Sequence, residues 1–388
     1  MIDRDQAFLA AIKRIADEVA GPAADRVDRE AAFPQATLDA LREEGALAAF
    51  VPTRLGGQGL RFETIASAAF ELGRRCGASG MVFAMHQIQV ATLVRHLDGA
   101  PWFEAYLRDL VGEQSLLASI TSEIGTGGDI GRSNAAVVPG EDGRSTFEKQ
   151  APTVSYGGQA DAFLTTLRRT PEAEGGDQVI VLTRRDQMTL DQQGTWDPLG
   201  MRGTCSPGYT ARATFDAEQI LPTAFATVAT ESMVPVTHIL WSHLWLGIAT
   251  DAFDRSRAFV RAAARQRPDQ VPPTAIHLSH LMSELALLRA EVSSGLRDFG
   301  EIIESDDRER LATMAMRLRF NNLKIAASDQ APRICQGALA VSGIVGYKND
   351  TPFSVGRHLR DSLSASLMIA NERIHQTNAS LLLIAKDV

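Results

Sequence analysis

The stretch best suited to bind a cofactor runs from Ser115 to Ala136, with the sequence SLLASITSEIGTGGDIGRSNAA. It begins as a short apolar strand and turns polar at Thr121 and Ser122, just before glycines at positions 125, 127 and 128. Hydroxyl groups can donate hydrogen bonds to an acceptor-rich ring or to phosphate oxygens, and glycines let backbone N–H groups approach a ligand closely. The stretch therefore indicates a cradle for an anionic cofactor, although an ordinary glycine-rich hairpin turn has the same composition. It lacks the G-x-G-x-x-G that opens a helix in a Rossmann dinucleotide site.

The composition limits the classes of protein to consider. A chain of 388 residues predicts two or three domains, and 45% hydrophobic with 22% charged residues is typical of a globular protein. The formal net charge of -8 argues against a nucleic-acid partner. The three scattered cysteines offer neither a disulfide framework nor metal-ligand spacing, and the first residues lack an apolar signal core. We therefore expect a cytoplasmic protein without a metal or a membrane span.

Hydrophobic periodicity predicts helices at both ends of the chain and strands between them. In the N-terminal part, a first helical pattern ends at Gly21-Pro22 and a second covers Gln35 to Glu44. A third, longer pattern runs from Arg61 to Leu97 and is interrupted at 77–80. His86 lies among apolar neighbours there, which favours a packed core residue over a catalyst. Period-two segments then predict five strands, at 137–140, 146–158, 162–169, 178–185 and 209–217.

Four long helical patterns follow the strands, at Val234–Ala264, Ala275–Ile303, Arg308–Val341 and Val355–Ala385. Long helices joined by short loops predict an antiparallel four-helix bundle. The predicted fold is mainly α with a central β domain. Its domains are an N-terminal helical domain (1–114), an antiparallel β domain (115–225) and a C-terminal four-helix bundle (226–388).

Five motifs in this order resemble the acyl-CoA dehydrogenase family of flavoproteins. Thr121 to Asp129 (TSEIGTGGD) resembles the T-E-P-x-x-G-S-D signature of that family. The other four motifs are LGGQGL at 55–60, SYGGQAD at 155–161, LGMRGT at 199–204, and GIVGY at 343–347 followed by Arg360-Asp361. The resemblance covers essentially the whole chain and implies the same three-domain fold.

The resemblance implies a flavin, FAD or alternatively FMN, between the β domain and the bundle. Hydroxyl and N–H groups near a flavin ring stabilise its reduced form. The residues implied to bind it are Ser119, Thr121, Ser122, Gly127, Gly128, Thr153, Val154, Ser155, Gly343 and Asn371. Those implied to contact the substrate are Trp241, Trp245 and Ile369, although a plain place in the bundle core is the more common role for each tryptophan.

The catalytic carboxylate of the family is missing from its usual positions. By alignment with the family, the glutamate that takes the α-proton of the acyl thioester falls on Ile369, and its alternative position falls on Thr237 or His238. Glu372, three residues after Ile369, is the remaining candidate base, because residues three apart lie on neighbouring parts of a helix. The segments that in the family bind the adenine end of FAD also differ in this sequence. Because FMN has no adenine, it remains an alternative cofactor.

Three functions follow from this pattern, in order of preference. The first is α,β-dehydrogenation of an acyl-CoA or carrier-bound thioester by an FAD-dependent homotetramer or homodimer, with electron-transfer flavoprotein or another acceptor as partner. The second is a flavin-dependent monooxygenase of the same fold, in which a histidine of the last helices acts as acid or base. Met368 falls at that histidine's position, and His358 and His375 are the nearest histidines. The third is a non-catalytic flavoprotein that supports an active homologue.

Overall fold

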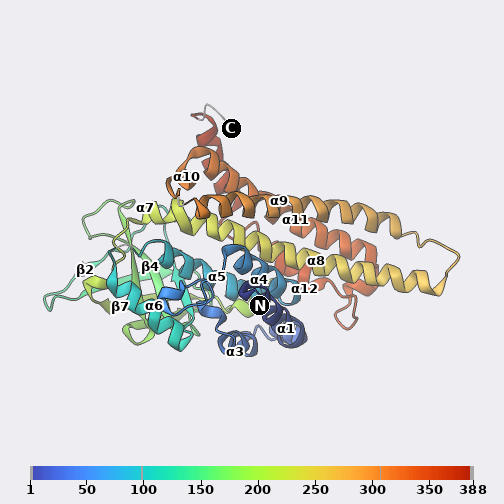
Figure 1. Ribbon diagram of the computed structural model, residues 1–388, viewed down its shortest axis with the longest axis horizontal. Helices are drawn as coiled ribbons and strands as arrows, with labels where there is room; N and C mark the ends of the chain where they lie inside the picture. The colour runs from blue at the N-terminus through green and yellow to red at the C-terminus, as the bar shows by residue number, and fades with distance from the viewer. Residues whose placement is uncertain (1–2, 98, 306, 385–388) are drawn as a thin grey trace.

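The computed structural model describes residues 3–97, 99–305 and 307–384. Strands gather at one end of the molecule, and three long helices run from them along its length (Figure 1). No helix in the described ranges is both long and apolar enough to cross a membrane. The predicted class is confirmed: helices, then a central β region, then a helical C-terminal part.

Six helices form the N-terminal part and bury a common apolar core. They are α1 (Arg4–Ile15), α2 (Gly21–Arg29), α3 (Gln35–Glu43), α4 (Phe62–Arg75), α5 (Gly77–Arg95) and α6 (Pro101–Glu113). Helix α5 is buried on nearly every side, because its neighbours cover it all round. The predicted break within 61–97 falls at Cys76, whose extended backbone separates α4 from α5.

The β region consists of two sheets that face a shared core. The strands are β1 (Leu117–Ile120), β2 (Val138–Pro139), β3 (Ser145–Ala151), β4 (Ala162–Arg168), β5 (Gln178–Arg184), β6 (Met188–Gln193) and β7 (Gly208–Phe215). One sheet has the order β1-β4-β5 and the other β2-β3-β7-β6. Side chains such as Phe147, Phe163 and Phe215 fill the space between them.

Two details of the β region differ from the sequence prediction. β1 pairs with β4 in parallel, with Leu117 opposite Ala162, whereas we predicted antiparallel pairs throughout. The parallel pair arises because the long connection from β1 leads through the glycine loop and the second sheet before the chain returns as β4. β6 was missed, because its residues are polar and mostly exposed.

The C-terminal part is built on three long helices, α8 (Val234–Gln266), α9 (Ala275–Glu304) and α11 (Met314–Tyr347), with short helices α7 (Phe225–Val228) and α10 (Glu309–Ala312). The single helix predicted over Val355–Ala385 is wrong. The chain instead forms α12 (Gly356–Leu363) and α13 (Asn371–Leu382), separated by turns.

Helix α8 also packs closely on α4 of the N-terminal part. A Cβ at Gly247 would lie 2.4 Å from the Phe70 carbonyl oxygen, and one at Gly73 would lie 2.6 Å from Leu244 Cδ1. Only glycine permits this approach of the two backbones. The long helices and the N-terminal helices therefore share one continuous core.

Candidate functional site

One cavity brings together the glycine-rich loop and the C-terminal helices. It has a volume of about 470 Å³, within the range of small-molecule sites. We call it the main cavity. Its lining residues are Gly128, Asp129, Ile130, Ala229, Thr230, Val234, Pro235, His238, Leu311, Arg317, Phe320, Asn321, Ile369, Arg373, Ile374, Gln376, Thr377 and Ser380. Two of the predicted site residues, Gly128 and Ile369, therefore face the same space from opposite parts of the chain.

The glycine-rich loop is held in a conformation that only glycine adopts readily. Gly125, Gly127 and Gly128 have φ angles of 90°, 62° and 82°. A Cβ added to Gly128 would meet no atom within 4 Å, so the loop is open on this side. Arg373 of α13 donates a hydrogen bond to the Gly127 carbonyl oxygen, which ties the loop to the C-terminal helices.

Glu123 fixes the base of this loop. Its buried carboxylate accepts hydrogen bonds from Ser133 Oγ and the Ala135 N–H, both at 2.7 Å, and lies 3.5 Å from Lys149 Nζ. Burial lowers the pKa of Lys149 to about 8, while Glu123 acts in the opposite direction. All of these partners belong to the β region, so Glu123 has a structural role here.

The predicted flavin-binding strands lie next to each other but outside the lining of the main cavity. Ser122 Oγ donates to the Thr153 carbonyl oxygen at 2.7 Å, which joins the two segments. Ser119, Thr121, Ser122 and Ser155 are half-buried, Thr153 is exposed and Val154 is buried. None of these six residues borders the main cavity, so their role in binding flavin stays a prediction.

Ile369 has an unusual backbone conformation. Its φ is 53°, which is rare for a β-branched residue and costs on the order of 1–3 kcal/mol. The buried Lys324 of α11 donates from Nζ to the Ile369 carbonyl oxygen at 2.7 Å. The same ammonium lies 5.7 Å from the centre of the Trp245 ring. Desolvation lowers the pKa of Lys324 to about 8, with Asp329 acting against it.

Asn371 and Glu372 lie just beyond Ile369. The Asn371 amide is engaged within the helices: its Oδ1 accepts from Lys324 Nζ at 2.7 Å, and its Nδ2 donates to Asp329 Oδ1 at 2.9 Å. Glu372 is exposed and does not border the main cavity. Asp129 is the only carboxylate among the lining residues, and it accepts a hydrogen bond from the Gly131 N–H at 2.9 Å.

The remaining predicted residues lie in the helices. Trp241 and Trp245 are buried with ring centres 5.9 Å apart, and neither indole Nε1 has a partner among the described residues. Neither ring borders the main cavity. Gly343 interrupts α11 near its end, with φ 56° and ψ -142°. A role for these three in binding also stays a prediction.

His238 is the main lining residue that sequence reasoning did not select. It is 1% exposed, and its Nδ1 lies 3.0 Å from the Phe320 carbonyl oxygen. Burial and the nearby Lys324 lower its pKa to about 3. The alignment did point to Thr237 or His238, but we were looking for a carboxylate there. Arg317 and Arg373 carried no signal in the sequence, since their positions depend on how the helices pack.

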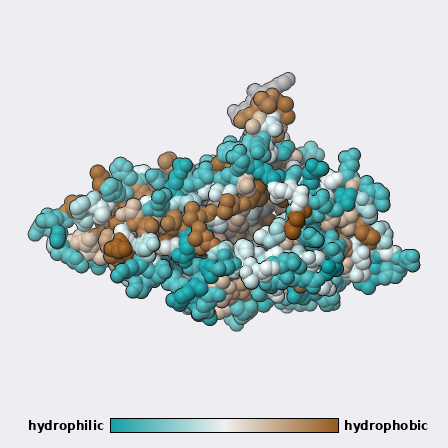
Figure 2. Space-filling model, turned by 180° about the vertical axis from the view of Figure 1, so that it is seen from behind, coloured by the Kyte–Doolittle hydropathy of each residue, from teal (hydrophilic) through white to brown (hydrophobic). Residues whose placement is uncertain are grey.

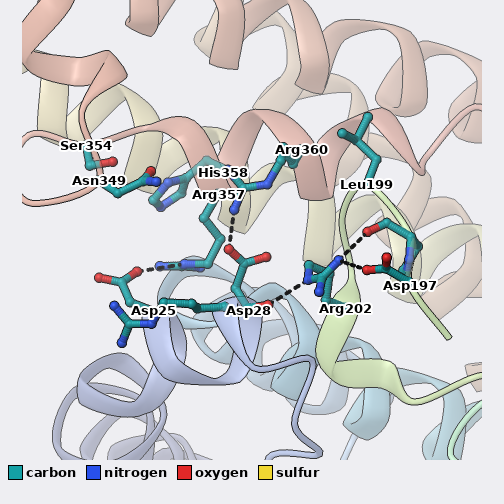
Figure 3. Close-up of a pocket in the computed structure, with 12 residues that line it drawn as sticks. Asp25, Asp28, Asp197, Leu199, Arg202, Asn349, Ser354, Arg357, His358 and Arg360 are labelled. Atoms are coloured by element: carbon teal, nitrogen blue, oxygen red, sulfur yellow. Dashed lines mark hydrogen bonds and ion pairs between the residues drawn. The ribbon is translucent and has the colours of Figure 1, made fainter.

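A second pocket, of about 500 Å³, is lined largely by charged side chains, several of which form ion pairs with one another. Figure 3 shows arginines and aspartates from α2, the 197–202 loop and α12 facing one another. Arg357 pairs with Asp25 at 3.2 Å, Arg202 pairs with Asp197 at 2.5 Å, and Arg360 pairs with Asp28. This pocket therefore lies where three parts of the chain meet, and its ion pairs connect them.

The candidate histidines of the last helices do not border the main cavity. His358 lies at the second pocket, where its Nε2 is 2.7 Å from Asp251 Oδ2. His375 is exposed on α13, and Met368 is half-buried. Neither is among the residues that line the main cavity.

Comparison with known proteins gives two kinds of relative. Residues 3–102 match the family profile "Acyl-CoA dehydrogenase, N-terminal domain". The chain is 24% identical over 389 residues to the probable FMNH2-dependent monooxygenase SfnC of Pseudomonas putida, covering 95% of this chain and 93% of that one. It is 24% identical over 365 residues to human mitochondrial short-chain specific acyl-CoA dehydrogenase, an alignment that covers 92% of this chain and 84% of the human protein. The structure of butyryl-CoA dehydrogenase from Megasphaera elsdenii superposes with a TM-score of 0.80 at 18% identity, covering 99% of each chain.

Proposed function

We propose that this chain, which has the acyl-CoA dehydrogenase fold and homologues among both dehydrogenases and monooxygenases, is a flavin-dependent oxidoreductase that oxygenates its substrate. Sequence reasoning ranked dehydrogenation of an acyl thioester first. The lining of the main cavity supports placing oxygenation first instead.

The observation that carries the proposal is that, among the residues the structure describes, no carboxylate borders the main cavity at either position where the family would place the base. Removal of an α-proton requires a base within hydrogen-bonding reach of the carbon, and such a base contributes a factor of about 10²–10⁴. Ile369 occupies one of these positions and Thr237 or His238 the other, while Glu372 is exposed outside the lining. Asp129, the one lining carboxylate, lies on the glycine-rich loop, where its Oδ1 accepts from the Gly131 N–H. Oxygenation makes no such demand for a carboxylate.

The loop fits a flavin, either FAD or FMN. Gly127 and Gly128 have positive φ, and Gly128 leaves open space beside the chain, so backbone groups there can come close to a ring or phosphate. Ser122 and the 153–155 segment lie side by side and would hold the ring from the β region. When bound, reduced flavin and O₂ supply the oxidation, in which one oxygen atom enters the substrate and the other leaves as water.

The chain's own residues would bind the substrate and exclude water from the reaction. Apolar side chains such as Ile130, Phe320 and Ile374 make up much of the cavity wall. Arg317 and Arg373 outnumber Asp129 among its charged residues, so the cavity favours neutral or anionic molecules over cations. Burial strengthens each polar contact made inside it.

Dehydrogenation of an acyl thioester is the second candidate. It is supported by the match of residues 3–102 and by the similarity to the human short-chain enzyme. In that case Glu372 would have to turn into the cavity and act as the base, and electrons would pass to an acceptor flavoprotein. Glu372→Gln should then abolish turnover and leave the flavin spectrum intact, whereas an oxygenase should keep its full activity.

Two assays on the purified protein separate the candidates. For the oxygenase we expect no bleaching of oxidised flavin by any of a panel of acyl-CoAs without oxygen, and substrate-dependent oxygen consumption when reduced flavin is supplied. Anaerobic bleaching by an acyl-CoA would overturn the proposal in favour of dehydrogenation. A protein that neither binds flavin nor responds to reduced FAD or FMN would favour the supporting, non-catalytic role.

We also propose that the chain forms a homodimer or homotetramer. Large apolar side chains are exposed in the C-terminal part, among them Ile344 and Tyr347 of α11 and Leu367 between α12 and α13. Figure 2 shows apolar residues gathered in a band across the rear face. Such surfaces commonly mark protein interfaces. Light scattering coupled to size-exclusion chromatography would measure the assembly, and a monomer at micromolar concentration would contradict it.

A further inference from the structure

The hydrogen bond of His238 determines which of its nitrogens carries the proton. A carbonyl oxygen can only accept, so Nδ1, 3.0 Å from the Phe320 carbonyl oxygen, must be the protonated nitrogen. The neutral ring then has an unprotonated Nε2 with a free lone pair. This tautomer is fixed by the backbone of α11 rather than by solvent.

The Nε2 atom of His238 is buried and has no partner among the described residues. His238 borders the main cavity at the first turns of α8, and its ring is 1% exposed. Leaving a buried acceptor unpaired is costly, and native proteins rarely do so without a functional reason. His238 therefore brings to the wall of the cavity a side chain with one unpaired acceptor atom.

The charges around the cavity limit what that ligand can be. Lys324 lies close enough to lower the pKa of His238, and Arg317 and Arg373 border the same space. An ammonium group would be repelled by these cations, whereas a neutral N–H or O–H group would not. An anion could approach the arginines but could not donate to Nε2 from its charged atoms.

We propose that His238 is a substrate-binding residue, whose Nε2 accepts a hydrogen bond from a neutral N–H or O–H group and so selects substrates that carry one. The inference rests on the proposed function only in taking the main cavity as the substrate site. It names the substrate class: a neutral, largely apolar molecule of up to a few rings with one hydrogen-bond donor.

The test uses two ring probes of similar shape, 2-naphthol and 2-methylnaphthalene, with the full-length protein. The first carries an O–H donor and the second carries none. We expect wild-type protein to bind 2-naphthol about tenfold more tightly, because only that probe satisfies the buried acceptor. Equal affinities for the two probes would overturn the proposal.

Three variants assign the preference to His238. His238→Phe removes the acceptor and should reduce the ratio of affinities to about one, whereas His238→Gln, whose Oε1 can accept, should restore part of it. His243→Phe is the matched control: His243 is buried on the same helix and bonded to the Ile239 carbonyl oxygen at 2.8 Å, but it does not border the cavity. The ratio should stay at its wild-type value in His243→Phe.

Nitrogen-15 NMR of the histidines gives a readout independent of folding defects in the variants. The His238 signals should show a protonated Nδ1 and a bare Nε2, and only the Nε2 signal should shift strongly on addition of 2-naphthol. A protonated Nε2 in the free protein would contradict the proposal.

The binding assays also separate this inference from the proposed function. A preference that depends on His238, without oxygenation of any probe or substrate, would support the inference and reject the function. If the protein oxygenates a substrate but His238→Phe keeps the wild-type preference for 2-naphthol over 2-methylnaphthalene, the proposed function is supported and the inference about His238 is rejected.

Discussion

His86 is a single residue that joins two parts of the molecule. Its Nε2 donates to the Leu47 carbonyl oxygen at 2.8 Å, and its Nδ1 accepts from the Leu117 N–H at 3.0 Å. It thus connects α5 to the start of β1. The sequence favoured a packed core role for this histidine, and its complete burial confirms that interpretation.

We expect His86→Leu to lower the stability of the protein by about 1–3 kcal/mol, because the buried Leu117 N–H loses its acceptor and the Leu47 carbonyl oxygen keeps only the 3.4 Å hydrogen bond from Gln87 Nε2. His243→Leu should cost less, since the Ile239 carbonyl that His243 contacts also has a helical partner. The comparison is made from midpoints of urea unfolding. Equal losses in the two variants would contradict the bridging role of His86.

Lys324 is expected to hold the unusual conformation of Ile369. Lys324→Met removes the hydrogen bonds to the Ile369 carbonyl oxygen and Asn371 Oδ1, but it also removes the cost of burying a charge. We therefore expect little change in global stability and faster amide hydrogen exchange over residues 365–372. Lys348→Met, at the exposed end of α11, serves as the control. Unchanged exchange in Lys324→Met would show that Ile369 is held by other contacts.

At the level of residues, the sequence predicted part of the site. It selected Gly128 and Ile369, which do border the main cavity. It did not select His238, because residue type directed the search to carboxylates. It could not select Arg317 and Arg373, because only the packing of α11 and α13 brings them to the glycine-rich loop.

Among the elements, α11 carries an interruption that can be tested without side-chain effects. Gly343 has φ 56° and ψ -142°, and a Cβ there would meet no atom within 4 Å. We expect Gly343→Ala to destabilise the protein by about 1–3 kcal/mol through backbone strain alone. Thermal unfolding would measure the loss.

Gly112 provides a control of opposite sign. It lies inside α6 with ordinary helical geometry, and a Cβ there also meets nothing within 4 Å. Gly112→Ala should therefore raise stability by roughly 0.5–1 kcal/mol. Changes of the same sign in both variants would show that the conformation of Gly343 is not strained for alanine.

The elements that sequence periodicity failed to predict are those determined by distant contacts. The residues between α12 and α13 contain neither glycine nor proline, and their apolar spacing is helical. They form turns instead, and Lys324, 45 positions before Ile369, donates a hydrogen bond to the Ile369 carbonyl oxygen near the end of these turns. Similarly, no local signal distinguishes a parallel from an antiparallel partner for β1. The long helices α8, α9 and α11 were predicted well, because their patterns extend over many turns.

For the molecule as a whole, buried neutral histidines contribute to the response to acid. Desolvation lowers the pKa of His86, His243 and His358 to about 4 and that of His238 to about 3. The unfolded chain takes up protons on these rings near pH 6.5, whereas the folded protein does not. The contribution of these histidines to the unfolding free energy is therefore fully present above pH 6.5 and is lost as the pH drops towards 4.

We expect the unfolding free energy to fall by about 1.4 kcal/mol per pH unit for each histidine that titrates only in the unfolded state. Asp361 acts in the opposite direction, because burial raises its pKa to about 6. The urea midpoint measured from pH 8 to pH 4.5 should drop steeply below pH 6.5, and His243→Phe should reduce the slope. A flat profile down to pH 4.5 would contradict this account.

The close contact of α4 with α8 has a consequence for the protein during its synthesis. Gly73 and Gly247, which permit the contact, are 174 positions apart (247 minus 73). At a translation rate of about 5–20 residues per second, α4 emerges from the ribosome roughly 10–35 s before its partner. Throughout that interval the surface of α4 around Phe70 and Gly73, which α8 covers in the folded protein, lacks its native partner, although α1 and α5 can already pack on other parts of α4. The nascent chain is then a natural client for a chaperone that binds exposed apolar helices, until α8 has been made.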